Sequence, residues 1–163
     1  MKIGADLDRQ TKKEHSLSAA AGIHTTPIRT DLLLMDCQIK LLRGLDQGNF
    51  AIIITRGLVD LAGFEYVLDA VIDQTRSLLD CKVLIDFQDS ILHFRPPDVA
   101  NFLASFHFEK WPHNHRIALV SSQDPLQYRR LGHLAGGLAT MKLEVRPFCD
   151  TREAIDWLTG IRR

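Results

Sequence analysis

The chain has 163 residues, 45% of them hydrophobic and 25% charged, and its formal net charge is zero. This length suits a single domain with a sizeable core, and the neutral charge argues against general binding to nucleic acid or to an anionic membrane surface. No apolar run approaches the roughly 20 residues of a membrane-spanning helix, and the first residues lack the apolar centre of a signal peptide. We therefore expect a cytoplasmic domain with no integral membrane segment and no nucleic-acid partner.

The N-terminal residues differ from the rest of the chain. Residues 1–30 are rich in Lys, Asp, Ser, Thr and Ala and show no sustained apolar period. This composition predicts a tail or a loosely docked arm, followed by a folded domain over residues 31–163. Asp31–Met35 is a candidate for a short anchoring segment.

A strand pair begins the folded domain. Cys37–Leu45 shows partial apolar alternation, which predicts an edge strand. Phe50–Thr55 is fully apolar up to its last residue and predicts a buried strand. Turn residues separate the two segments, so we expect a hairpin.

Helices and strands then alternate. Asp60, Asp124 and Asp150 each stand where an N-cap is expected. The predicted helices cover residues 60–79, 96–106, 124–141 and 150–161, and the predicted strands between them cover 82–87, 117–121 and 143–148. The sequence therefore predicts an α/β fold, a five-stranded, mostly parallel sheet with an N-terminal hairpin, right-handed crossovers and helices mainly on one face.

The second face of this sheet also needs a cover. The apolar runs Ala51–Ile54 and Val83–Ile85 are typical of strands buried on both faces. Strands in sequential order would leave all crossover helices on one face. The N-terminal arm or a second copy of the chain is therefore expected on the other, which is our reason to predict a homo-oligomer or a docked arm.

The glycines of the third predicted helix and the cysteines both have structural interpretations. Gly132, Gly136 and Gly137 weaken the third helix by up to about 1 kcal/mol each relative to Ala, which indicates a close backbone approach or a helix end near Gly137. The cysteines are three in number, far apart and without a Cys-x-x-Cys pair. They are typical of small buried hydrophobes rather than of a disulfide framework or a zinc site.

Several segments together resemble a known family. They are the turn Gly57–Asp60, the strands Lys82–Phe87 and Arg116–Val120, and the ending Phe148–Leu158. Over about residues 36–160 the chain resembles the SpoIIAA-like, STAS-type proteins, and more narrowly the small bacterial STAS-like proteins of unknown function. The resemblance implies a βα superhelix shared with lipid-binding CRAL/TRIO domains. It also implies a non-enzymatic role, as in anti-sigma-factor antagonists or the regulatory modules of anion transporters.

The serine that is phosphorylated in those antagonists has no counterpart here. It opens the helix after the second central strand, and Phe94–Pro97, at about that place, contains no serine. Ser90 is the nearest hydroxyl and is more typical of local hydrogen bonding, although a phosphate on it would be near enough in sequence to contact Arg95. The phosphorylation switch is therefore not carried over.

Polar residues follow the predicted parallel strands, at the edge of the sheet where ligands usually bind. Arg56, Arg95 and the Ser121–Ser122 pair are candidates to hold an anion, and an ordinary polar loop rim is the alternative. Walker and Gly-x-Gly-x-x-Gly motifs are absent, so we expect no nucleotide and no other cofactor. The candidate partner or ligand rim comprises Arg56, Asp86, Asp89, Ser90, His93, Phe94, Arg95, Ser121 and Ser122.

A catalytic role finds less support. His107, His113 and His115 surround Trp111, but a zinc site needs a further ligand and a dry pocket, and a solvated connection is the favoured interpretation. We predict no metal site. Ser121–Ser122 lies between a strand and a helix without a Gly-x-Ser-x-Gly motif, so we do not expect an enzyme.

Three functional hypotheses follow. The first is a non-enzymatic, cytoplasmic regulatory or interaction module that binds a partner protein through residues 86–95 and the helix 98–106. The second is a carrier of a small apolar molecule or lipid, related to CRAL/TRIO domains. The third is a metal-dependent enzyme that uses the histidine cluster. The aromatic residues that would line the carrier's cavity are Phe94, Phe102, Phe106, Phe108 and Trp111.

Overall fold

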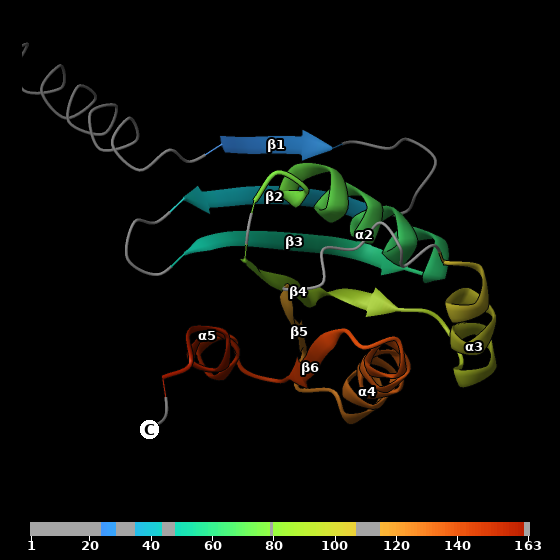
Figure 1. The fold of residues 1–163 in the computed structure, drawn as a ribbon. Helices are drawn as coiled ribbons and strands as arrows, with labels where there is room; N and C mark the ends of the chain where they lie inside the picture. Colours follow the sequence, from blue (N-terminus) through green and yellow to red (C-terminus); the bar gives the residue numbers. More distant parts are fainter. Residues whose placement is uncertain (1–23, 29–34, 44–47, 79, 107–114, 162–163) are drawn as a thin grey trace, which may run out of the picture.

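The computed structural model describes residues 24–28, 35–43, 48–78, 80–106 and 115–161. These residues form one mixed sheet with the strand order β1-β2-β3-β4-β5-β6 (Figure 1). The strands are β1 (His24–Ile28), β2 (Met35–Arg43), β3 (Asn49–Val59), β4 (Cys81–Leu92), β5 (Arg116–Ser121) and β6 (Glu144–Phe148). The helices are α2 (Leu61–Thr75), α3 (Pro96–Ser105), α4 (Pro125–Thr140) and α5 (Thr151–Thr159).

The predicted α/β architecture is confirmed. β2 and β3 form the antiparallel hairpin, and β3 to β6 are parallel neighbours joined by crossovers through α2, α3 and α4. The three predicted aspartate N-caps are also present. Asp60 accepts a hydrogen bond from the Gly63 backbone N–H at 2.8 Å, and Asp124 and Asp150 cap α4 and α5 in the same way.

The sheet has one strand more than the sequence predicted. β1 lies inside the segment expected to be an arm and pairs antiparallel with β2, so β2 is not an edge strand. The segment is short and rich in β-branched residues, which favour extended backbone, and its pairing covers backbone groups that an edge strand would leave open. Residues 1–23 and 29–34 lie outside the described residues, and so do the rest of the expected arm and most of the expected anchoring segment.

The main core lies between the sheet and α2, α3 and α4. Phe64 of α2 is fully buried, and its ring centroid lies 6.0 Å from that of Phe87 in β4 and 5.9 Å from that of Phe102 in α3. The Phe64 ring of α2 thereby joins β4 and α3, which are far apart from it in sequence, to the same apolar cluster. Because large aromatic rings bury much apolar area, this cluster is a major source of the fold's stability.

The second face of the sheet carries α5. Ala154 and Leu158 are fully buried against Leu84, Ala118 and Val120 of β4 and β5. Figure 1 shows α2 in front of β2 and β3, whereas α5 lies across the other side of the sheet, near β4 and β5. The helices are therefore mainly, but not wholly, on one face.

Two of the cysteines are interior residues. Cys37 and Cys81 are buried, and burial raises the pKa of each thiol to about 11. Both are therefore protonated near neutral pH and pack as small hydrophobes. Cys149 is half-buried.

One glycine marks a close approach of two helices. A Cβ atom at Gly137 would lie 2.4 Å from Leu103 Cδ1 and 3.4 Å from Val99 Cγ1, both of α3. A Cβ atom at Gly132 or Gly136 would instead point into open space and meet nothing within 4 Å. The close approach expected from the glycine pattern is therefore found at Gly137, and α4 continues beyond it to Thr140.

Gly136→Ala and Gly137→Ala form a matched pair. We expect Gly136→Ala to raise the free energy of unfolding by about 0.4–1 kcal/mol, because Ala is the better helix former and its methyl group meets nothing. Gly137→Ala should be less stable than Gly136→Ala by about 1–3 kcal/mol, because Leu103 must move. Urea denaturation of both variants tests this difference, and equal stabilities would contradict the close approach.

Candidate functional site

The rim at the carboxyl end of the sheet is built by a two-stranded extension of β3 and β4. β5 pairs with β4 only as far as Phe87, whereas β3 and β4 remain paired up to Val59 and Leu92. The register shifts between Ile54 and Arg56, and Gly57 has a φ of 93°, in the left-handed region that favours glycine. The segment 86–95, expected as a loop, is therefore mostly strand.

Two buried hydroxyl groups hold the base of this extension. Thr55 Oγ1 donates to the backbone oxygen of Asp86 at 3.0 Å and lies 2.8 Å from Ser90 Oγ. The single proton of Thr55 is used in the first bond, so Ser90 donates in the second. Ser90, placed on the candidate rim by sequence, is thus an interior residue that links β4 to β3.

The two hydroxyl groups should differ in their contribution to stability. Thr55→Val removes the bond to Asp86 and leaves the buried Ser90 hydroxyl without its acceptor, so we expect a loss of about 1–3 kcal/mol. Ser90→Ala removes one bond and leaves the Thr55 donor engaged, so a loss of about 0.5–1.5 kcal/mol is expected. A double-mutant cycle in urea should show coupling, and purely additive losses would argue against this hydrogen-bond chain.

Polar groups gather on the second-face side of the extension. Arg56 Nε lies 3.7 Å from Asp89 Oδ2, and both side chains are exposed, so this ion pair contributes about 0–1 kcal/mol. Asp86 Oδ1 accepts from the Gln88 backbone N–H at 2.9 Å, and Gln88 Oε1 accepts from Thr151 Oγ1 at 3.2 Å. The start of α5 is thereby tied to the base of the rim.

Asp86 is the rim carboxylate whose ionisation is disfavoured. Burial raises its pKa, the hydrogen bond from the Gln88 N–H partly opposes this, and the negative charge of Asp89 adds to the rise. A raised carboxyl pKa means that the group favours the folded state most when protonated, and this contribution is lost as the pH rises through the folded-state pKa.

Asp86→Asn should therefore stabilise the protein at neutral pH. Asn keeps an oxygen for the Gln88 N–H and removes the disfavoured charge. The gain over the parent chain should shrink as the pH falls toward about 4, where the carboxyl of the unfolded chain also becomes protonated. Thermal unfolding of both proteins across this pH range measures the effect. A gain that is constant with pH would show that the charge is not its cause.

The end of the extension is fastened to α4. The Leu92 backbone N–H donates to Gln127 Oε1 at 2.8 Å, and the Arg130 guanidinium donates to the Leu92 backbone oxygen. Neither Gln127 nor Arg130 was among the residues predicted for the rim. The available signal was that Gln127 occupies the same helical stripe as the buried Leu131 and Leu134, a place where a polar side chain needs a partner.

Exposed apolar side chains flank this attachment. Ile91, next to Leu92, is 60% exposed, and Leu126, next to Gln127, is 51% exposed. Leu58, directly across from Ile91 in the strand pair, is half-buried. We call these three residues the apolar rim.

The other predicted rim residues take different places. His93 is exposed, and its backbone N–H donates to Val59, continuing the strand pair. Arg95 is exposed and binds the Asp98 carboxylate with both its backbone and its guanidinium, which caps α3. Phe94 is 5% exposed and belongs to the core. Ser121 is also buried and donates to the Ser122 backbone oxygen at 2.7 Å. Of the predicted anion ligands, Arg56 therefore pairs with Asp89, Arg95 with Asp98, and Ser121 with the Ser122 backbone.

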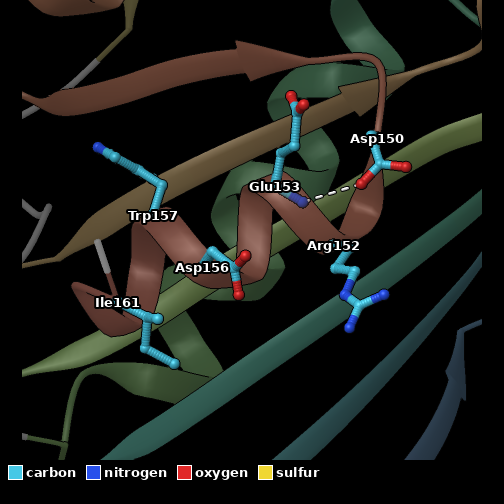
Figure 2. Close-up of a pocket in the computed structure, with 6 residues that line it drawn as sticks. All are labelled: Asp150, Arg152, Glu153, Asp156, Trp157 and Ile161. Carbon is cyan, nitrogen blue, oxygen red and sulfur yellow. Dashed lines mark hydrogen bonds between the residues drawn. The ribbon is translucent and has the colours of Figure 1, made fainter. Parts of the chain in front are cut away.

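The aromatic residues expected in a carrier cavity are core residues where the structure describes them. Phe94, Phe102 and Phe106 are buried, and the rings of Phe102 and Phe106 lie 5.3 Å apart. Phe108 and Trp111 lie outside the described residues. A hollow of about 600 Å³ is found elsewhere, along α5 (Figure 2).

The histidine cluster can be placed only in part. His115 is 2% exposed, its Nδ1 accepts from the Cys81 backbone N–H at 3.5 Å, and burial lowers its pKa. His107 and His113 lie outside the described residues. Among those the structure does describe, no three His, Cys, Asp or Glu side chains are grouped to hold a metal ion. None of the described helices is long and apolar enough to cross a bilayer.

Comparison with known proteins gives a match to a solved structure. No family model and no curated protein matches the chain. A solved structure of an uncharacterized protein from the DUF3478 family with a SpoIIAA-like fold, from Shewanella loihica PV-4, is similar over 80% of this chain and 99% of that chain, with 19% identity and a TM-score of 0.49. The fold named for this neighbour is the one that the sequence resembles.

Proposed function

We propose that the chain is a non-enzymatic, cytoplasmic regulatory or protein-interaction module of the STAS type, without the usual phosphoacceptor serine, that binds a partner protein through the apolar rim. The observation that carries the proposal is the exposure of Ile91 and Leu126 on a rigid support. The two side chains flank the same Leu92–Gln127 attachment, and exposed apolar residues with polar groups around them are typical of protein-binding surfaces.

Hydrogen bonds hold the backbone that carries these side chains in place. Thr55 and Ser90 fix the base of the β3–β4 extension, and Gln127 and Arg130 fix its end. A preformed surface loses little conformational entropy on binding. The exposed Arg56–Asp89 pair borders the same extension and supplies the polar rim that such surfaces have.

The sheet edges are less suited to a partner. Among the described strands, β1 and β6 are the outer ones, and each contains a proline, Pro27 and Pro147. Proline has no backbone N–H to donate, so it hinders the addition of a further strand. This favours binding by side chains at the rim over strand addition.

Ser90 supports a module without the phosphorylation switch. Its hydroxyl is buried and donates to Thr55, so a kinase would have to open the β3–β4 pairing to reach it. We propose that partner binding depends on the apolar rim itself.

Affinity capture with the purified, tagged chain tests the proposal. Ile91→Asp and Leu126→Asp should each abolish capture of the proteins that the parent chain retains, because each places a charge in the apolar contact. Met141→Asp is the matched control, since Met141 is also exposed but follows the far end of α4. Capture that is unchanged in the Ile91 and Leu126 variants, or lost equally in the control, would contradict the proposal.

A further inference from the structure

The described residues cover the second face of the sheet only in part. Strand register places its side chains in rows across the sheet, because residues paired on neighbouring strands share a face. One row runs Leu42–Phe50–Lys82, the next runs Lys40–Ile52–Leu84, and the third runs Gln38–Ile54–Asp86. Leu84 is buried beneath α5, whereas the residues of β2 and β3 in these rows are only half-buried, although Phe50 and Ile52 also pack against the cluster around Leu84.

The half-covered part forms an apolar floor with basic flanks. Its apolar residues are Leu42, Phe50, Ile52 and Ile54, and we call this surface the strand trough. Lys40 stands on its β2 side and Lys82 on its β4 side, where the Lys82 ammonium lies 5.2 Å from the Phe50 ring centre. Asp86 closes its carboxyl end.

The outer surface of α5 stands beside this trough and has the opposite charge. It carries three carboxylates and one guanidinium, and the hollow of about 600 Å³ runs along it (Figure 2). Ile155 and Ile161 are exposed by 40% and 53%. We call this surface the α5 ridge; it comprises Asp150, Arg152, Glu153, Ile155, Asp156 and Ile161.

The two surfaces face the same way and lie side by side. Thr151 binds Gln88 of β4, so the α5 side that carries Thr151 and, one turn later, Ile155 is the side next to the trough. Trp157 lies on the other side, with its ring centre 5.6 Å from that of Phe148 in β6. Figure 2 shows Arg152 and Trp157 on opposite sides of the helix, in agreement with these contacts.

We infer that the strand trough is filled by the α5 ridge of a second copy of the chain. A two-fold axis between trough and ridge sets each ridge over the partner's trough, which gives a closed, isologous dimer. Lys40 and Lys82 then meet the acidic ridge, and Ile155 and Ile161 bring apolar contact to the floor. Charge complementarity is what favours this occupant, because two troughs placed face to face would bring their lysines together. The apolar rim takes no part in this contact.

The dimer is tested by light scattering on the full chain after size exclusion. The parent chain should have twice the monomer mass. The double variants Lys40→Glu/Lys82→Glu and Glu153→Lys/Asp156→Lys should each weaken the dimer about tenfold or more, because each leaves like charges across both contacts. An equimolar mixture of the two variants should again give the dimer mass, since a heterodimer has opposite charges across both contacts.

Further variants make the outcome decisive. Ile52→Glu should also yield monomer, whereas Ile91→Asp, on the apolar rim, should leave the dimer intact and separates this inference from the proposed function. Circular dichroism confirms folding, and single substitutions Lys40→Glu and Asp156→Lys carry the same test if a double variant unfolds. A parent chain that is monomeric up to about 1 mM, as expected if residues 1–23 or another partner occupy the trough, overturns the inference. So does a dimer that survives the charge substitutions, or variants that are folded but do not pair when mixed.

Discussion

A parallel sheet with its strands in sequential order places its crossover helices on one face, because each right-handed crossover returns to the same side. In this chain α2, α3 and α4 follow that constraint, and their apolar stripes form the main core with Phe64 at its centre. The second face then depends on α5, which follows the last strand, packs on β4 and β5, and reaches β3 only at Phe50 and Ile52. The strand trough is a direct consequence of this constraint.

The same strand order also shapes the rim. β5 stops at Ser121, so β3 and β4 extend beyond their neighbours. The polar groups of this extension therefore need hydrogen-bond partners other than a neighbouring strand. Hydroxyl groups do so inside, at Thr55 and Ser90, and α4 does so at the end, through Gln127 and Arg130. The interior partners leave the apolar side chain of Ile91 facing outward on a well-supported strand.

The sequence predicted the parts of the structure that depend on local patterns. Helical spacing and the capping aspartates located α2, α4 and α5, and the apolar runs located β3 to β6. It did not predict features set by distant partners. β1 is polar and short, and it becomes a strand because β2 offers a free edge. Residues 88–92 contain Asp and Ser, which favour turns locally, yet pairing with β3 keeps them extended. Phe94 was expected on the rim, but the aromatic core around Phe102 buries it.

Asp86 links the strand trough and the β3–β4 extension through its effect on the stability of the fold. Its carboxylate lies where the trough ends and the β3–β4 extension begins, and its nearest partners are backbone and side-chain groups that also position Gln88 and Thr151. Burial raises its pKa, so the charged form works against folding at neutral pH. An asparagine there would relieve that cost and keep an acceptor for the Gln88 N–H, whereas a leucine would leave that N–H without its acceptor. The hydrogen bond of Asp86 to Gln88 thus helps to tie α5 to the sheet, while the charge of the same carboxylate works against folding.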